Sequence, residues 1–255
     1  MRPLARLALA VPLLVVTACE TVPYTGRTQL QILPESAELQ MGLDSYQEVL
    51  KKSKVSRDAG LNEQVGRVGR RIAAATGRAD YQWEFKVLED PQVNAFCLPG
   101  GKVAVYTGIL PVTRDDAGLA AVMGHEVAHA LARHGGERVS QTLLVQGTLT
   151  GVQLALARGD PAMVQQVTSL LGAGAAVGVL LPWSRAQESE ADHLGLIFMA
   201  KAGYHPSAAR YFWVRMSQSG GQKPPEFLST HPSDATRIRQ IEGWMPEAMR
   251  YYTPR

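Results

Sequence analysis

The sequence has little net charge and no long hydrophobic run, and both absences exclude classes of protein. The formal net charge over 255 residues is +3. Without Arg2 and Arg6, which lie in a segment that we expect to be removed, it is 3 − 2 = +1, too little to favour nucleic-acid binding. The apolar runs at 7–16 and 170–181 are each too short to span a bilayer as a helix. Since 45% of the residues are hydrophobic and 19% are charged, we expect a globular chain, with one sizeable core or two small domains.

The first 18 residues have the pattern of a secretory signal peptide, in which Arg2 and Arg6 precede the apolar run. A plain N-terminal anchor helix is the alternative, although the run is short for one. The letters VTAC at 16–19 resemble the lipobox of bacterial lipoproteins, which implies cleavage before Cys19 and acylation of its sulfur. The next residue is Glu20 rather than aspartate, which by the same resemblance implies an anchor in the outer membrane, facing the periplasm.

Cysteine is scarce, since Cys19 and Cys97 are the only two. If Cys19 is acylated, Cys97 has no partner within its own chain, so no internal disulfide can form even in an oxidising compartment. Cys97 lies among apolar residues in NAFCLPG, which favours a buried and inert thiol over a reactive one.

Hydrophobic periodicity and turn residues predict a mainly helical α+β fold with a small sheet beside the most apolar helix. We expect a single domain over 34–255, after a lipidated tether at 19–33. Strands are predicted at 81–90 and within 93–110, around a turn at 99–101. The predicted helices are 34–54, 61–76, 113–134, a helical hairpin over 137–181 broken at 159–161, 184–202, 206–219 and one after STHPSD.

Two of these helices carry further expectations. Thr113 and Asp116 fit a capping box, and Gly135-Gly136 fits a helix stop, so the residues between them would form one buried helix. For the apolar run at 170–181, packing over the core or covering a cleft is favoured over contact with a membrane.

The stretch GHEVAHALARHGG at 124–136 places His125 and His129 four residues apart, and therefore on one helical face. With Glu126 beside them, the pattern is His-Glu-x-x-His. These groups would be costly to bury in an apolar helix without partners. We therefore predict one Zn²⁺ on the two histidines, with Glu126 as general base. His134 would lie about 180° round a continuous helix from His125, and we interpret it as a structural residue at the helix C-terminus.

A catalytic zinc needs a third protein ligand and an open position. Glu188 and Asp192 share one face of the helix at 184–202 with the small residues Ala191 and Gly195, which would let another helix approach. We predict Glu188 as the third ligand and Asp192 as the acceptor of a hydrogen bond from a ligand histidine. Glu190 points away from this face. A solvated acidic face is the alternative, which the small residues argue against.

The two motifs GHEVAHALARH and ESEAD together resemble the gluzincin metalloproteases of the HtpX, BepA and LoiP type, relatives of the CaaX prenyl protease. The stretches VNAFCLPGGKVAVYTGIL, STHPSDATRI and PYTGRTQL resemble the same group, and the layout is closest to LoiP-like outer-membrane lipoproteins. The resemblance implies a zincin-type domain that hydrolyses peptide bonds of unfolded or misassembled cell-envelope proteins. It also implies zinc on His125, His129 and Glu188.

The sequence offers candidates for substrate contact and for regulation. The strand KVAVYT, with Val103, Ala104 and Val105, is a candidate to accept an extended substrate as an added strand. His231 is either a surface histidine, a donor to the oxyanion, or, as the resemblance to BepA suggests, a fourth ligand that closes the open zinc position. The alternative functions are a metal-stabilised chaperone or scaffold with weak proteolysis, and a hydrolase of small lipids or peptides. Glu126 argues against the chaperone, because a structural zinc needs no base.

Overall fold

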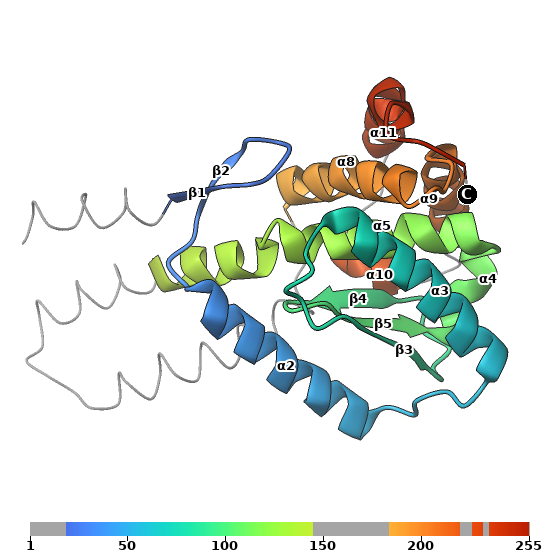
Figure 1. Cartoon of the computed structure of the whole chain (residues 1–255), viewed down its shortest axis with the longest axis horizontal. Helices are drawn as coiled ribbons and strands as arrows, with labels where there is room; N and C mark the ends of the chain where they lie inside the picture. The colour runs from blue at the N-terminus through green and yellow to red at the C-terminus, as the bar shows by residue number, and fades with distance from the viewer. Residues whose placement is uncertain (1–18, 145–183, 220–225, 232–234, 255) are drawn as a thin grey trace, which may run out of the picture.

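The computed structural model describes residues 19–144, 184–219, 226–231 and 235–254, which form a mainly helical α+β arrangement with two small sheets (Figure 1). The predicted leader, the break at 159–161 and the apolar run at 170–181 lie outside the described residues. The strands are β1 (Cys19–Thr21), β2 (Thr28–Leu30), β3 (Glu84–Leu88), β4 (Ala95–Leu98) and β5 (Lys102–Tyr106). The helices are α2 (Glu35–Lys52), α3 (Ala59–Thr76), the 3-10 turn η1 (Thr107–Ile109), α4 (Leu110–Thr113), α5 (Asp116–Leu131), α8 (Arg185–Lys201), α9 (Ser207–Gln218), α10 (Glu226–Thr230) and α11 (Ala235–Met249). Residues 134–144 are also helical.

The main sheet has the strand order β3-β5-β4, with β5 parallel to β3 and antiparallel to β4. The predicted turn between β4 and β5 is confirmed, and Gly100 and Gly101 adopt φ angles of 84° and 83° that favour glycine. The substrate-strand prediction is corrected, because β5 is paired along both edges and Val103, Ala104 and Val105 are fully buried. Within the described part of this sheet, β4 has no partner strand on its outer edge, and it contacts α5.

The sheet lies between α3 and α5 on one face and α2 on the other (Figure 1). Side chains on its two faces belong to two hydrophobic cores. The larger core includes Val87 and Val105, and in the smaller one Phe96 packs with Tyr46 of α2. Gly42 lets α2 approach the end of β4, since a Cβ there would lie 2.4 Å from the Pro99 carbonyl oxygen. Residues of α2 and β4 thereby form two walls of a cleft that is also lined by residues of α5.

Helices α5 and α8 cross at two glycines. A Cβ added to Gly124 would lie 3.0 Å from the Gly195 carbonyl oxygen, and one added to Gly195 would lie 3.0 Å from the His125 amide nitrogen. The prediction that small residues of the 184–202 helix admit a second helix is confirmed. The contact brings the histidine pair of α5 against the carboxylates of α8.

The two ends of α5 differ from prediction. The N-cap is Asp115, whose side chain accepts from the Gly118 amide at 2.8 Å, rather than Thr113, whose hydroxyl donates to a carbonyl of α4. The helix ends at Leu131 and not at Gly135-Gly136, because Arg133 adopts the left-handed conformation at φ 54°. A new helix starts at residue 134, so the chain changes direction before the glycines.

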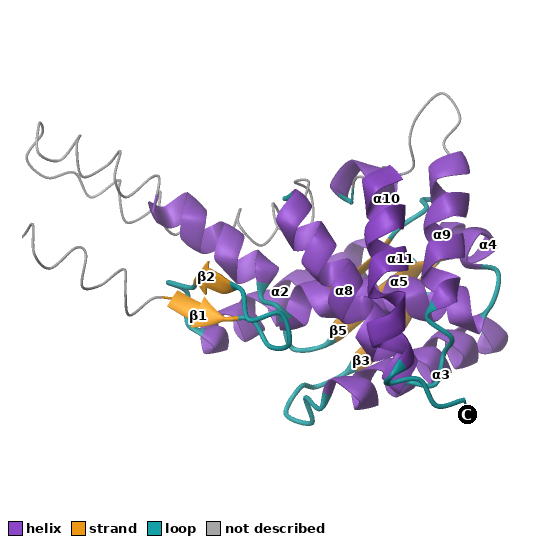
Figure 2. Ribbon diagram, turned by 90° about the horizontal axis from the view of Figure 1, so that it is seen from above, coloured by secondary structure: helices purple, strands orange, loops and turns teal. Residues whose placement is uncertain are grey.

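The segment predicted as a tether is docked on the domain, as a hairpin of β1 and β2 beside the helix at 134–144 (Figures 1 and 2). Val22 is buried, and Gln29 Nε2 donates to the Ala132 carbonyl oxygen at 2.8 Å. At the tip, the Tyr24 hydroxyl accepts from Lys201 Nζ at 2.7 Å. Within the described part of the chain, no helix has the length and hydropathy needed to cross a membrane.

Candidate metal centre

Four buried side chains converge where α5, α8 and the residue after α10 meet. They are His125, His129, Glu188 and His231, and each offers one ligand atom within 4.8 Å of the others. His125 Nε2 lies 3.1 Å from both His129 Nε2 and His231 Nδ1, and Glu188 Oε1 lies 2.9 Å from His231 Nδ1. Tetrahedral zinc with bonds of about 2.0–2.1 Å places its ligand atoms about 3.3 Å apart. The donor set and its spacing therefore fit that ion, and three of the four residues are the predicted ligands.

Glu126 lies at the edge of this cluster, with its Oε1 atom 3.5 Å from His231 Nε2. Among the described residues that oxygen has no hydrogen-bond partner, although it is buried. Burial raises the pKa of the Glu126 carboxyl group, and nearby His231 and His125 oppose the rise. A carboxylate with an unused oxygen and a raised pKa is suited to accept a proton near neutral pH.

Asp192 and Arg237 fix the orientation of the ligands from outside the cluster. Asp192 Oδ1 lies 2.9 Å from His125 Nδ1, which is the contact predicted for it. Arg237 Nη1 donates to Glu188 Oε2 at 2.8 Å, and its Nη2 donates to Asp192 Oδ1 at 2.7 Å. The guanidinium also lies over the ring of Trp213, 3.2 Å from its centroid. Sequence reasoning missed this role of Arg237, for which the only local signal is an arginine beside the apolar face of the last helix.

These contacts set the charge of the two ligands that they touch. Burial by itself would lower the pKa of His125, but hydrogen bonds with Asp192 and Glu188 raise it to about 9. Burial would raise the pKa of Glu188, yet the charges of His231 and Arg237 hold it well below its usual range. Glu188 is thus an anionic carboxylate, the form that binds a cation.

His134 is not at the far side of a continuous helix, because the turn at Arg133 brings it back toward the cluster. Its Nδ1 atom lies 2.8 Å from His129 Nδ1, and its Nε2 atom lies 2.9 Å from Glu190 Oε2. His134 is fully buried, and burial lowers its pKa although Glu190 opposes the shift. Glu190 points away from the ligand face as expected, but it is buried rather than solvated.

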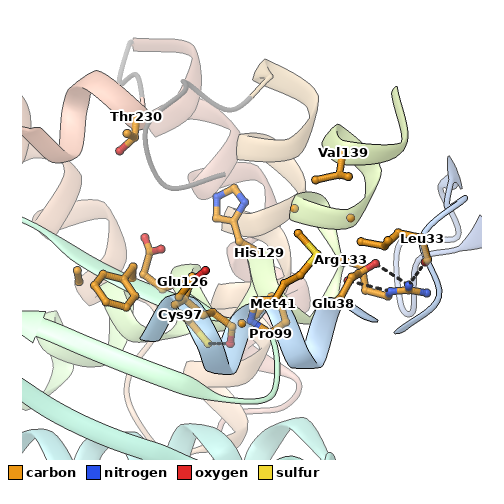
Figure 3. Close-up of a pocket in the computed structure, with 18 of the residues that line it drawn as sticks. Leu33, Glu38, Met41, Cys97, Pro99, Glu126, His129, Arg133, Val139 and Thr230 are labelled. Carbon is orange, nitrogen blue, oxygen red and sulfur yellow. Dashed lines mark hydrogen bonds and ion pairs between the residues drawn. The ribbon is translucent and has the colours of Figure 1, made fainter. Parts of the chain in front are cut away.

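A cleft leads to the cluster from the side of β4 and α2 (Figure 3). Glu126 and His129 lie in its floor, and the far end is closed by Arg133, which is paired with Glu38. Cys97 of β4 lines the same cleft, where burial raises the pKa of its thiol. Other walls come from 94–99, from α2 and from the helix at 134–144, and Thr230 and His231 also line the cleft. The cleft therefore runs along the unpaired edge of β4 and ends at the candidate base.

Comparison with known proteins identifies the family. The profile of peptidase family M48 matches residues 59–245, which include both motifs of the cluster. The chain belongs to peptidase family M48.

Two relatives of this M48 chain show how far the similarity extends. The chain is 41% identical over 237 residues to the mitochondrial metalloendopeptidase OMA1 of Schizosaccharomyces pombe, covering 91% of this chain and 68% of that protein. It is 30% identical over 250 residues to the mitochondrial metalloendopeptidase OMA1 of Homo sapiens, covering 92% of this chain but 47% of that protein. The resemblance to M48 gluzincins and the prediction of a metalloendopeptidase are confirmed.

A third relative is bacterial, the beta-barrel assembly-enhancing protease of Escherichia coli, at 27% identity over 229 residues and 46% of that protein's length. The relatives named as mitochondrial come from two yeasts, a plant and three vertebrates. They contradict the bacterial outer-membrane location predicted from the leader, which is wrong on this comparison. They also give no support to an acyl anchor on Cys19, whose side chain is exposed.

Proposed function

We propose that this M48 chain is a zinc endopeptidase, with a zincin-type site, that cleaves extended segments of unfolded or misassembled proteins. The observation that carries the proposal is that the buried Oε1 atom of Glu126 has no hydrogen-bond partner among the described residues and lies beside a cluster of convergent ligands. His125, His129 and Glu188 would hold the zinc. The bound ion supplies a Lewis acid for the peptide carbonyl and lowers the pKa of a water molecule.

Side chains around the ligand cluster would transfer the proton, orient the ligands and form the cleft wall. Glu126 accepts a proton from the attacking water and delivers it to the leaving amine nitrogen. Asp192 accepts the Nδ1 proton of His125, so that the Nε2 proton is the one that zinc binding would displace, which would direct the Nε2 lone pair into the cluster. Arg237 holds both carboxylates of α8 in place. Cys97 has none of these roles and serves as part of the cleft wall.

The unpaired edge of β4 could bind a substrate peptide through main-chain groups, which does not depend on the side chains of the peptide. Asn94 accepts through its carbonyl oxygen from Tyr106 in β5, whereas the Val93 carbonyl oxygen accepts from Phe227 on the opposite side. Because main-chain groups alternate in direction along a strand, Ala95 and Cys97 face the same side as Val93. An extended peptide could pair with the main-chain groups of Ala95 and Cys97 by β-augmentation, in exchange for the hydrogen bond of 2.9 Å that the Ala95 amide donates to Asn94 Oδ1. Such pairing supports unfolded protein as the substrate class.

The experiment that tests the proposal compares the wild-type chain with Glu126→Gln on unfolded casein. Loss of the base should lower kcat by about 10²–10⁴-fold, the usual contribution of general acid–base catalysis. Zinc content, measured by elemental analysis, should be the same as in the wild-type chain. Glu63→Gln is the control, because Glu63 is an exposed carboxylate of α3. Near wild-type cleavage by Glu126→Gln would overturn the mechanism, and zinc-loaded protein that suppresses aggregation without cutting would favour the chaperone.

A further inference from the structure

A continuous chain of polar contacts links the metal ligand His129 to the N-terminal hairpin. It runs from His129 Nδ1 to His134 Nδ1 at 2.8 Å, and from His134 Nε2 to Glu190 Oε2 at 2.9 Å. Glu190 Oε2 then accepts from Arg27 Nε at 2.7 Å, and its Oε1 accepts from the hydroxyl of Thr25. The far end of the chain of contacts lies between β1 and β2, a part of the sequence far from the histidine helix.

We propose that Arg27 and Thr25 are positioning residues for His129, acting through Glu190 and His134. The inference rests on the proposed metal site. It assigns a purpose to the hairpin, which lies outside the 59–245 region that the family profile matches.

The direction of each hydrogen bond follows from the donors available. An ionised Glu190 only accepts, so His134 carries its proton on Nε2. The other nitrogen of a neutral imidazole is then an acceptor, and it takes the proton that His129 carries on Nδ1. The lone pair of His129 Nε2 is thereby directed into the cluster. Asp192 does the same for His125 in one step, without an intervening histidine.

Arg27 is what keeps Glu190 in place. Its Nη1 and Nη2 atoms bind both carboxylate oxygens of Glu137, at 2.8 and 2.9 Å, while its Nε holds Glu190. A bidentate pair of this kind fixes geometry as well as charge. Glu137 and Glu190 are both buried, so without the guanidinium two carboxylates on neighbouring helices would repel each other. Glu190 would then turn away, and His134 would lose the acceptor that sets its tautomer.

Arg78 provides a matched control within the same chain. Its side chain is 29% exposed, against 28% for Arg27, and it too pairs with two carboxylates, Glu35 and Asp80. In the part of the chain that the structure describes, neither partner of Arg78 belongs to the ligand cluster. Arg27→Met and Arg78→Met therefore each remove an arginine that pairs with two carboxylates, and only Arg27 is connected to His129. The partners of Arg78 are the more exposed, at 42% and 63% against 7% and 4% for those of Arg27.

The test measures zinc affinity of the full chain by chelator competition, together with the visible spectrum of the Co²⁺-loaded protein and the melting temperature. Arg27→Met should weaken zinc binding about 10–100-fold, which is the usual effect of removing groups that orient a ligand histidine through hydrogen bonds. It should also change the visible spectrum of the Co²⁺-loaded protein. Arg78→Met should leave zinc affinity close to that of the wild type and lower the melting temperature less than Arg27→Met does, because its carboxylate partners are more exposed. Arg27→Lys should retain part of the zinc affinity, since lysine keeps the positive charge but cannot form the bidentate pair of a guanidinium with a carboxylate.

Two results would overturn the inference. One is wild-type zinc affinity and cobalt spectrum in Arg27→Met, and the other is equal weakening by Arg78→Met, which would indicate general destabilisation. Both readouts are independent of proteolysis, so wild-type protein that binds zinc without cutting casein would refute the proposed function and leave this inference standing. Wild-type protein that binds neither zinc nor cobalt would refute both.

Discussion

His231 places its Nδ1 atom 2.9 Å from Glu188 Oε1, inside the ligand cluster, and the residue also lines the cleft. Its ring stacks on Phe227, with centroids 4.5 Å apart, and its backbone amide donates to the Phe227 carbonyl oxygen. Only 3% of the residue is exposed, so it is not a surface histidine. The same side chain also faces Glu126 through Nε2. This geometry favours a fourth ligand over a donor to the oxyanion.

The first prediction is that His231→Ala increases proteolysis or self-cleavage several-fold. Removing the fourth ligand opens the position that a water and substrate must share, because a catalytic zinc keeps one open position. The measurement is the initial rate on casein and the rate of self-cleavage, with zinc content determined in parallel. A fall in kcat of about 10²–10³-fold would instead identify an oxyanion donor. Unchanged rates with unchanged zinc would show that the residue has neither role.

The second prediction separates the carboxylates of α8 by zinc stoichiometry. Glu188→Ala should lose most of the bound zinc, because it removes a ligand atom. Asp192→Ala should retain zinc but bind it about 10–100-fold more weakly, since His125 loses the acceptor that orients it. Elemental analysis after dialysis against a weak chelator distinguishes the two. If Asp192→Ala is stripped of zinc while Glu188→Ala keeps it, the assignment of the third ligand is wrong.

Much of this site follows from helical spacing alone. His125, His129, Glu188 and Asp192 belong to two helices whose periodicity is clear, and each lies on the face where the spacing puts it. The ends of two helices also follow from single residues, because Gly77 closes α3 and Ser184 caps α8. Local signals of this kind depend only on neighbours in sequence.

The features that the sequence did not predict depend on contacts between segments that are distant in the chain. Arg133 adopts a left-handed conformation without being glycine, and its side chain is held by Glu38 and by the Leu33 carbonyl oxygen. Nothing in GHEVAHALARHGG signals that turn, so helical spacing places His134 on the wrong side of the helix. The edge position of β4 is likewise a property of the assembled sheet, because alternating residues do not reveal which strand lies in the middle.

The third prediction concerns the crossing of α5 and α8. Gly195→Ala should destabilise the fold by about 1–3 kcal/mol, because the added carbon meets the backbone of His125, which cannot move aside like a flexible side chain. It should also weaken zinc binding, since His125 would shift. Gly243→Ala is the control, because a Cβ there meets no described atom within 4 Å. That change should stabilise helix α11 by up to about 1 kcal/mol. Chemical denaturation of both variants checks the contrast, and equal effects would show that the crossing is not tight.

The last prediction tests the edge of β4 with modified peptide substrates. A peptide that pairs with β4 as an added strand uses the main-chain groups of every second residue, since the alternate groups point away from the sheet. N-methylation at successive positions should therefore lower kcat/KM in an alternating pattern. Each loss should be at most about 10-fold, because one hydrogen bond contributes about 0.5–1.5 kcal/mol. Alanine substitution at the same positions should have smaller effects, as expected of binding through the backbone. The measurement is cleavage of a peptide series under conditions where the concentration is well below KM. A uniform effect of N-methylation, or a dominant effect of one side chain, would show that a side-chain pocket and not the edge of β4 selects the substrate.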